Sequence, residues 1–365
     1  MNGILPNPLL GADPEFFILA NDEPISADKF FGKKRRNVSH QIFFDGFQAE
    51  INLPPNTCRE LFTADLGGII REASSKIEHK GRKLGIKDFK IFPVATIRIK
   101  PEHLIDVDEE CLRFGCSPDA ILYSSEERSY PDGRKHFYRY AGGHIHVGLK
   151  DRIVFLEILK DNKLEFLRNS IKLMDRLGGL LSVVLSPYED ERQRRKYYGQ
   201  AGCYRLNNHG IEYRTPSSFW IIAPPLVSVM TASVRNAVKL ALSKIGDEIL
   251  SEPTDEEIVK IINNCDRKSA FDYLSIYRRI LIKHIPKRLK NYFPLCRKSI
   301  FYIIKRIYER GGYRYFFNPA HITNYYKTRI LGNGIHQFSQ LMIKYDDKEI
   351  QYMLDGGEDK WIYTI

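Results

Sequence analysis

Three short segments of the sequence each place two chemically capable side chains two residues apart. The pairs are Asp13 and Glu15, His144 and His146, and Glu212 and Arg214. On a β-strand, residues two apart point to the same face and stand about 6.6 Å from each other. Each pair lies in apolar sequence, as in Phe16–Leu19 after the first. The spacing therefore predicts three strands of one sheet, with one face lining a polar cavity.

The residue types in these pairs indicate a site for a hard divalent cation. Carboxylate oxygens with an imidazole suit Mg²⁺ or Mn²⁺, and the absence of thiolates from these segments speaks against structural zinc. Each pair alone has an ordinary alternative. Two acids can lie on an exposed strand, a His-x-His pair can serve a zinc hydrolase, and a Glu-x-Arg pair can form a surface ion pair. The combination favours the metal site.

A fourth segment, from Asp45 to Glu50, adds two carboxylates five residues apart. On a straight strand, this spacing places them on opposite faces. Both reach one site only if the chain bends or bulges at Gly46. We expect Glu50 to be the better ligand and Asp45 the second choice.

A fifth segment, residues 194–205, mixes arginines with glycines directly before the Glu212 strand. A guanidinium group matches the geometry of phosphate, so arginines beside a metal site commonly contact phosphates. The alternative is a solvated surface loop. The sequence has no Walker-type, Gly-x-Gly-x-x-Gly, His-Glu-x-x-His, Gly-x-Ser-x-Gly or kinase catalytic-loop pattern. If ATP binds, it must bind through metals and arginines rather than a phosphate-binding loop.

The order of predicted elements favours an α+β fold with a mostly antiparallel sheet, because regular βαβ alternation is lacking. Apolar spacing predicts strands at 9–20, 41–53, 89–99, 143–149 and 211–215, and helices at 62–84, 164–184 and 226–245, the last ended by Gly246. Thr254 and Glu257 form a capping-box pattern that opens a helical, basic, Tyr-rich region. We divide the chain into a catalytic core, 1–250, and a mainly helical extension, 251–365.

Composition narrows the class of protein. The chain has 365 residues, a net charge of +11 and six cysteines without zinc-site spacing, which we interpret as free thiols of a reducing cytoplasm. No apolar run is long enough for a membrane helix. The charge fits a solvated surface that attracts phosphates, and it also fits nucleic-acid binding by the basic C-terminal third. Charge alone does not decide between them.

Six segments in one order resemble a known family. They are Gly11–Phe16, Asp45–Glu50, Phe114–Asp119, Gly142–Gly148, Tyr198–Arg205 and Gly210–Ser217. Together they are similar to the phage-type COOH–NH₂ ligases, or type-2 amidoligases, which are related to the glutamine synthetase and glutamate–cysteine ligase fold. The resemblance spans about residues 9–225. It implies a glutamine-synthetase-like curved sheet, mostly antiparallel and packed by helices.

The resemblance also implies roles at matching positions. The implied metal ligands are Asp13, Glu15, Glu50, His144 and Glu212. The implied contacts to nucleotide phosphates are His146 and Arg205, to which we add Arg195 from the arginine segment. Arg205 and Arg214 would act on the transferring phosphoryl group or the substrate carboxylate, and Asp45 or another carboxylate of the site would accept the proton of the amine. Asp13 stands where glutamine synthetase has the longer glutamate.

The implied activity is an ATP- and Mg²⁺-dependent carboxylate–amine ligase that works through an acyl phosphate, with Mn²⁺ as an alternative ion. Its substrates stay open among amino acids, peptide or protein termini, polyamines and cell-wall peptides. We also expect that the protein can form a homo-oligomer. We expect it in the cytoplasm, which is the host cytoplasm if a phage encodes the chain. Three rivals remain: an ATP phosphotransferase on the same fold, a Mn²⁺ or Zn²⁺ hydrolase using His144 and His146, and a nucleic-acid-binding protein.

Overall fold

A computed structural model of the chain describes residues 4–36, 38, 40–114, 120–124, 131–149 and 153–326. The sequence motif Phe114–Asp119 lies mostly outside these residues. The described strands are β1 (Leu9–Ala20), β2 (Glu23–Ile25), β3 (Gln41–Asp45), β4 (Gln48–Asn56), β5 (Phe89–Phe92), β6 (Thr96–Arg98), β7 (Ala120–Ile121), β8 (Tyr138–Tyr140), β9 (Gly143–Gly148), β10 (Cys203–Leu206) and β11 (Gly210–Tyr213).

The large sheet has the strand order β3-β4-β1-β9-β11-β10-β7, and every pairing in it is antiparallel. The long strand β1 lies near its middle. Its second half also pairs with the short strands β2 and β5. Strands β6 and β8 form a separate two-stranded sheet. The predicted α+β class with a mostly antiparallel sheet is confirmed.

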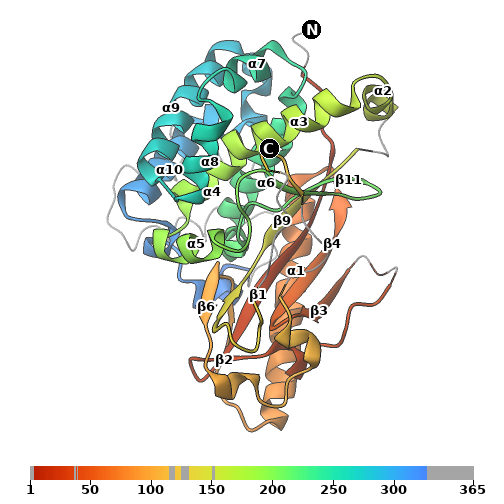
Figure 1. Cartoon of the computed structure of the whole chain (residues 1–365), viewed down its shortest axis with the longest axis vertical. Coiled ribbons are helices and arrows are strands. Elements are labelled where there is room, and N and C mark those ends of the chain that lie inside the picture. Colours follow the sequence, from red (N-terminus) through yellow and green to blue (C-terminus); the bar gives the residue numbers. More distant parts are fainter. Residues whose placement is uncertain are drawn as a thin grey trace.

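Helices pack against this sheet and against one another. The described α-helices are α1 (Arg59–Lys83), α2 (Ile153–Asp161), α3 (Lys163–Met174), α4 (Leu180–Leu185), α5 (Tyr188–Arg195), α6 (Pro224–Leu240), α7 (Lys244–Leu250), α8 (Asp255–Asn263), α9 (Arg267–His284), α10 (Lys298–Glu309) and α11 (Ile322–Tyr325). Helix α1 packs on β4 and α6 on β9, and the two helices contact each other. Figure 1 shows helices α7–α10 gathered at the end of the molecule opposite β2.

Three predicted elements differ from the structure. The predicted strand 89–99 is two strands of different sheets, β5 and β6. The predicted strand 41–53 is a hairpin of β3 and β4 joined by a turn at Gly46 and Phe47. The predicted helix 226–245 ends at Leu240, and Gly246 lies inside the next helix, α7. A Cβ atom on Gly246 would stand 2.1 Å from the carbonyl oxygen of Leu240. This glycine therefore permits α7 to pack closely against the end of α6 and does not terminate a helix.

The helices after residue 250 share the hydrophobic core of the preceding part. One buried cluster includes Leu10 of β1, Leu181 of α4, Leu274 of α9 and Tyr326. The predicted cap of α8 is present, because the Thr254 hydroxyl accepts the backbone N–H of Glu257. Residues 327–365 of the predicted extension lie outside the described residues. The division at residue 250 stays a prediction.

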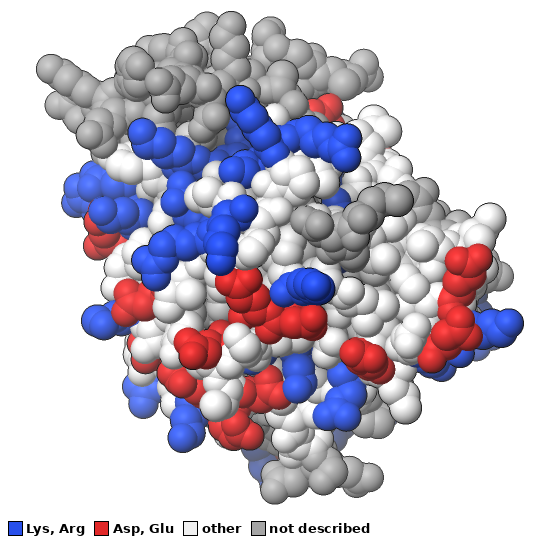
Figure 2. Space-filling view, turned by 90° about the horizontal axis from the view of Figure 1, so that it is seen from above, with Lys and Arg blue, Asp and Glu red and all other residues white. Residues whose placement is uncertain are grey.

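The five cysteines within the described residues are all free thiols, whereas Cys116 lies outside them. None of the described helices combines the length and the apolar character needed to cross a membrane. Positive charge is unevenly spread over the surface. Figure 2 shows lysines and arginines gathered on one part of the face seen from above, apart from a band of acidic residues.

Candidate functional site

The register of the sheet brings the predicted pairs to one face. Asp13 of β1 lies opposite His144 of β9, and Glu212 of β11 lies opposite His146. On the other side of β1, Glu15 lies opposite Glu50 of β4. Residues opposite each other in an antiparallel pair point to the same face. The face that these residues share, here called the polar face, is the one that the spacing predicted.

The hairpin turn at Gly46 adds Asp45 to the polar face. Gly46 has a φ of +64°, a left-handed conformation that glycine adopts without strain. The turn places Asp45 opposite Gln48 and Phe43 opposite Glu50. Asp45 and Glu50 therefore lie on one side of the sheet despite their five-residue spacing. The sequence predicted that Asp45 and Glu50 reach one site only if the chain bends at Gly46, and the tight turn there provides this bend.

Three carboxylates form the first donor group on this face. One ligand oxygen from each of Glu15, Asp45 and Glu50 lies within 4.8 Å of the others. Burial raises the pKa of Glu15 to about 8, and the charge of Asp45 adds to this effect. Burial and the charges of Asp13 and Asp45 hold the pKa of Glu50 well above its ordinary value. Without a bound cation, burial and mutual repulsion therefore favour protonation of Glu15 and Glu50.

Few positive groups offset this charge. The backbone N–H of Gly142 donates to Glu15 Oε2 over 2.6 Å, and the Gln48 amide donates to the same oxygen over 3.3 Å. The half-exposed Lys34 places its Nζ atom 3.5 Å from Glu50 Oε1. Buried carboxylates require a hydrogen-bonded partner or a cation. An all-oxygen group of this charge fits Mg²⁺.

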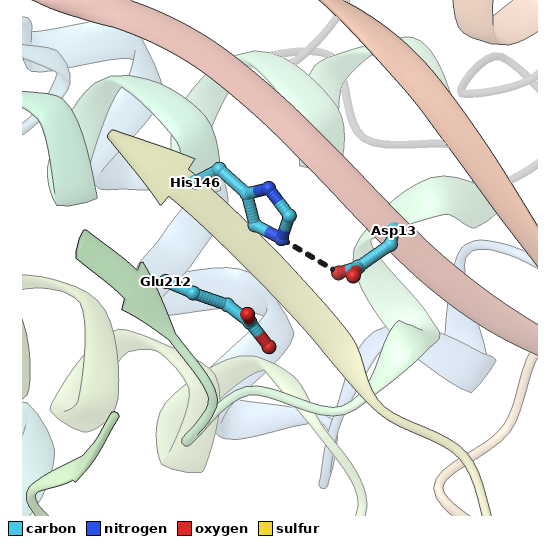
Figure 3. Close-up of side chains that lie close together, drawn as sticks. All are labelled: Asp13, His146 and Glu212. Atoms are coloured by element: carbon cyan, nitrogen blue, oxygen red, sulfur yellow. Dashed lines mark hydrogen bonds and ion pairs between the residues drawn. The ribbon is translucent and has the colours of Figure 1, made fainter. Parts of the chain in front are cut away.

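The second donor group combines Asp13, His146 and Glu212, whose ligand atoms also lie within 4.8 Å of one another. Figure 3 shows the His146 ring turned toward Asp13, with the Glu212 carboxylate reaching the same space from the neighbouring strand. His146 Nε2 lies 3.0 Å from Asp13 Oδ1. Burial alone would raise the pKa of Asp13, but the charges of His146 and His144 outweigh it and hold the pKa well below its usual range. This group fits Mg²⁺ or Mn²⁺.

His144 lies between the second donor group and Tyr198. Its Nε2 atom lies 2.7 Å from the hydroxyl of Tyr198, and its Nδ1 atom lies 3.2 Å from Asp13 Oδ1. Arg214 donates to the same Tyr198 hydroxyl over 2.9 Å and pairs with Glu212. Burial and the charge of Arg214 lower the pKa of His144. The Nδ1 atom of His144 also lies 3.7 Å from Glu212 Oε1, so both histidines border the carboxylates of Asp13 and Glu212, and the role of His144 as a metal ligand stays a prediction.

Tyr198 is the residue of this network to which sequence reasoning gave no role. It stands in a motif that the family resemblance included, between arginines and a glycine turn, and that position was the available signal. Its hydroxyl joins the side chains of His144 and Arg214, both of which are buried. Tyr198 therefore orients two groups of the polar face.

The three predicted arginines have unequal positions. Arg205 of β10 lies opposite Glu212 and is partly exposed, with Nη1 at 3.6 Å from Glu212 Oε1. Arg214 is buried beside the same carboxylate. Arg195 differs from the expectation that it contacts phosphate. Its buried guanidinium donates to the carbonyl oxygens of Gly199 and Thr215, so it holds together the loop before β10 and the segment after β11.

A cavity of about 260 Å³ adjoins the carboxylate group. It is lined by Glu15, Asp45, Gly46, Gln48, Glu110, Arg113, Phe114, Arg139, Tyr140, Tyr197 and Tyr198. The rings of Tyr140 and Tyr197 are stacked with their centroids 5.9 Å apart. Aromatic faces beside a polar wall are typical of a small-molecule site. Sequence reasoning did not identify this wall, because its residues come from separate segments.

The glycines before His144 let β9 approach the segment after β11. A Cβ atom on Gly143 would stand 2.2 Å from the carbonyl oxygen of Ser217 and 2.4 Å from Trp220 Nε1. We expect Gly143→Ala to lower the free energy of unfolding by about 2 kcal/mol, because backbone atoms must move to relieve the overlap. Urea denaturation measures this loss. Gly32→Ala is the control, since no atom lies within 4 Å of a Cβ there, and an equal loss in both variants contradicts the steric argument.

Comparisons with known proteins give three findings. No curated protein matches the chain. A solved structure with a similar arrangement is a bifunctional glutathione synthetase from Pasteurella multocida, with 13% sequence identity and a TM-score of 0.45. The match covers 88% of this chain and 52% of the synthetase, so the chain spans about half the length of that protein. Residues 82–258 match the model of the phage phiEco32-like COOH–NH₂ ligases, type 2, the family that the motifs resemble, and this match begins after β4.

Proposed function

We propose that the chain is an ATP- and Mg²⁺-dependent ligase that joins a carboxylate to an amine through an acyl phosphate. The observation that carries this proposal is the polar face, on which two donor groups for divalent cations lie side by side on adjoining strands. The matched family is named for the same reaction class. In this proposal, residues 1–250 supply the catalytic core, and the helices after residue 250 support it.

The two donor groups would hold the metal ions. Asp13, His146 and Glu212 form one candidate set, and Glu15, Asp45 and Glu50 form the other. When bound, Mg²⁺ supplies charge neutralisation for the phosphates of ATP. His144 keeps Asp13 and Tyr198 in place through its two ring nitrogens. In this proposal it positions both groups and, through Nδ1, is a further candidate ligand for the metal held by Asp13 and Glu212.

The first chemical step transfers the γ-phosphoryl group of ATP to an oxygen of the substrate carboxylate. A P–O bond to the substrate forms, the bond to the β-phosphate oxygen breaks, and ADP leaves. Arg205 is partly exposed beside Glu212 and would stabilise the negative charge of the transferring group. Arg214 is buried against Glu212 and would hold that carboxylate in place.

The second step forms the amide. The amine attacks the carbonyl carbon of the acyl phosphate, a C–N bond forms, and inorganic phosphate leaves with the electron pair of the broken C–O bond. The proton lost by the amine needs an acceptor at the site. Asp45 is the proposed acceptor of this proton. It is half-buried at the edge of the polar face and lines the 260 Å³ cavity, which would admit the substrates.

The test is release of ADP from Mg²⁺-ATP in the presence of pooled carboxylates and amines. We expect release only when both a carboxylate and an amine are supplied, and a decrease of about 100-fold or more in Asp45→Asn, because this variant removes both a candidate metal ligand and the candidate proton acceptor. Thermal unfolding of the variant checks that the fold is retained. ADP release without an amine, with an isolable phosphorylated product, would instead show a phosphotransferase.

A further inference from the structure

Arg194 is a buried arginine that has no part in the proposed chemistry. It lies on α5, directly before Arg195, and its side chain has no exposed surface. Its guanidinium lies between α5 and residues 214–217, the segment that continues from β11. A buried guanidinium is costly unless ion pairs or hydrogen bonds hold it, so its partners indicate its role.

The guanidinium of Arg194 binds three successive carbonyl oxygens. Its Nη1 atom donates to Thr215 over 2.9 Å, and its Nη2 atom donates to Pro216 over 3.0 Å and to Arg214 over 3.4 Å. The carbonyl oxygen of Pro216 also accepts the backbone N–H of Gly143 over 3.0 Å. Because the donors of a guanidinium form a rigid planar fork, Arg194 fixes the backbone path of this segment and its junction with the start of β9.

The same guanidinium lies against the ring of Tyr198. Arg194 Cζ is 4.9 Å from the ring centroid, a distance typical of a cation–π contact. The Tyr198 hydroxyl lies 2.7 Å from His144 Nε2 and accepts from Arg214 Nη2 over 2.9 Å. Arg194 therefore supports both the backbone of Arg214 and the tyrosine to which the side chain of Arg214 donates.

Gly199 makes room for this arrangement. It has a φ of +62°, and a Cβ atom at this position would overlap the guanidinium of Arg194. Glycine has no Cβ and adopts this left-handed conformation without strain. The turn after Tyr198 can therefore close directly over Arg194, whereas a larger residue at position 199 would displace the guanidinium.

Glu191, one turn earlier on α5, balances the positive charge. Its Oε2 atom lies 3.7 Å from Arg194 Nη1 and 3.3 Å from Arg195 Nη2. Its Oε1 atom accepts from the hydroxyl of Ser217. Glu191 is also buried, so these charges are paired inside the protein. Through Glu191 and Arg194, helix α5 contacts each of the residues 214–217.

We infer that Arg194 is a positioning residue that fixes Arg214 and Tyr198 in place on the polar face. Because its side chain has no exposed surface, it acts on the site through these two residues. The consequence for catalysis rests on the proposed function. In that function Arg214 holds Glu212 during phosphoryl transfer, so a displaced Arg214 slows the transfer more than it weakens ATP binding.

Arg194→Lys tests this inference, because lysine keeps the charge and loses the planar fork. We expect kcat for ADP release to fall about 10- to 100-fold, with the KM for ATP within about threefold of the wild type. Arg235→Lys is the matched control. Arg235 is a buried arginine of α6 that donates to the carbonyl oxygen of Thr57, and its variant should keep the wild-type kcat. An equal fall of kcat in both variants overturns the inference, since loss of any buried arginine then explains it.

The NMR signals of the His144 ring give a readout that does not require activity. In the metal-free protein at one pH, the ¹⁵N chemical shifts of this ring depend on the hydrogen bond between Nε2 and the Tyr198 hydroxyl. We expect the shifts to change in Arg194→Lys, because Tyr198 loses its support, and to stay unchanged in Arg235→Lys. The variant His144→Gln identifies the signals.

Gly199→Ala provides a second route to the same displacement and retains the arginine. It should change the His144 signals in the same way as Arg194→Lys, and urea denaturation shows that each variant is folded before it is compared. Unchanged His144 signals in the folded variants overturn the inference, as does a wild-type kcat in Arg194→Lys. A wild type that releases no ADP contradicts the proposed function instead, and the His144 signals then decide the role of Arg194 by themselves.

Discussion

Glu50→Gln is expected to reduce Mg²⁺-ATP-dependent ADP release by at least about 100-fold while making the metal-free protein more stable. Glu50 is buried in a group of three carboxylates, and its nearby cation is the half-exposed Lys34. Glutamine keeps the shape of the side chain and removes its charge. A residue needed only for the fold would not show opposite effects on activity and stability.

The stability gain follows from the pKa of Glu50, which lies well above its ordinary value because of burial and the charges of Asp13 and Asp45. A carboxyl group whose pKa is raised on folding contributes stability below its unfolded pKa and loses it as the pH rises through the folded value. At neutral pH, the glutamate therefore costs stability that glutamine does not. We expect a gain of about 1–3 kcal/mol at pH 7 without Mg²⁺, which shrinks as the pH approaches 4.

Urea denaturation with and without Mg²⁺ measures both parts of this prediction. Mg²⁺ should stabilise the wild type and have little effect on Glu50→Gln. The control is Glu165→Gln on α3, an exposed acid distant from the polar face, which should behave as the wild type. A Glu50→Gln variant that loses stability at pH 7 without metal would show that the carboxylate group is not a cation site.

Arg214→Met is expected to lower the free energy of unfolding by about 3–5 kcal/mol and to abolish activity. Arg214 is buried, pairs with Glu212 and donates to the hydroxyl of Tyr198. Methionine approximates its length without its charge. The loss arises because Glu212 then stays buried without its closest partner, although Arg205 lies 3.6 Å away and offsets part of the cost.

A double-mutant cycle separates the pair from the packing around it. Adding Glu212→Gln to Arg214→Met should restore part of the lost stability, since the unpaired charge disappears, while activity stays absent. Chemical denaturation of the wild type, the two single variants and the double variant gives the interaction energy. Arg168→Met, at an exposed arginine of α3, is the control for loss of a cation. Simple additivity of the two losses would contradict a direct buried pair.

These predictions rest on geometry that was only partly accessible from sequence. The two-residue period of a strand was enough to expect that Asp13 and Glu15 share a face, and that His144 and His146 do. The two-residue period does not predict which strands are neighbours in the sheet. That Glu50 lies opposite Glu15, and Glu212 opposite His146, depends on strand pairing between residues far apart in the chain.

The sequence by itself determined the chemical types at the site, the common face of each pair and the resemblance to the family whose model matches residues 82–258. Tertiary structure decided which atoms meet. It brought His146 into a donor group with Asp13 and Glu212, and it made Arg195 a buried contact of the loop carbonyls. Local spacing is set by covalent geometry, whereas partners and burial are set by the packing of the whole chain.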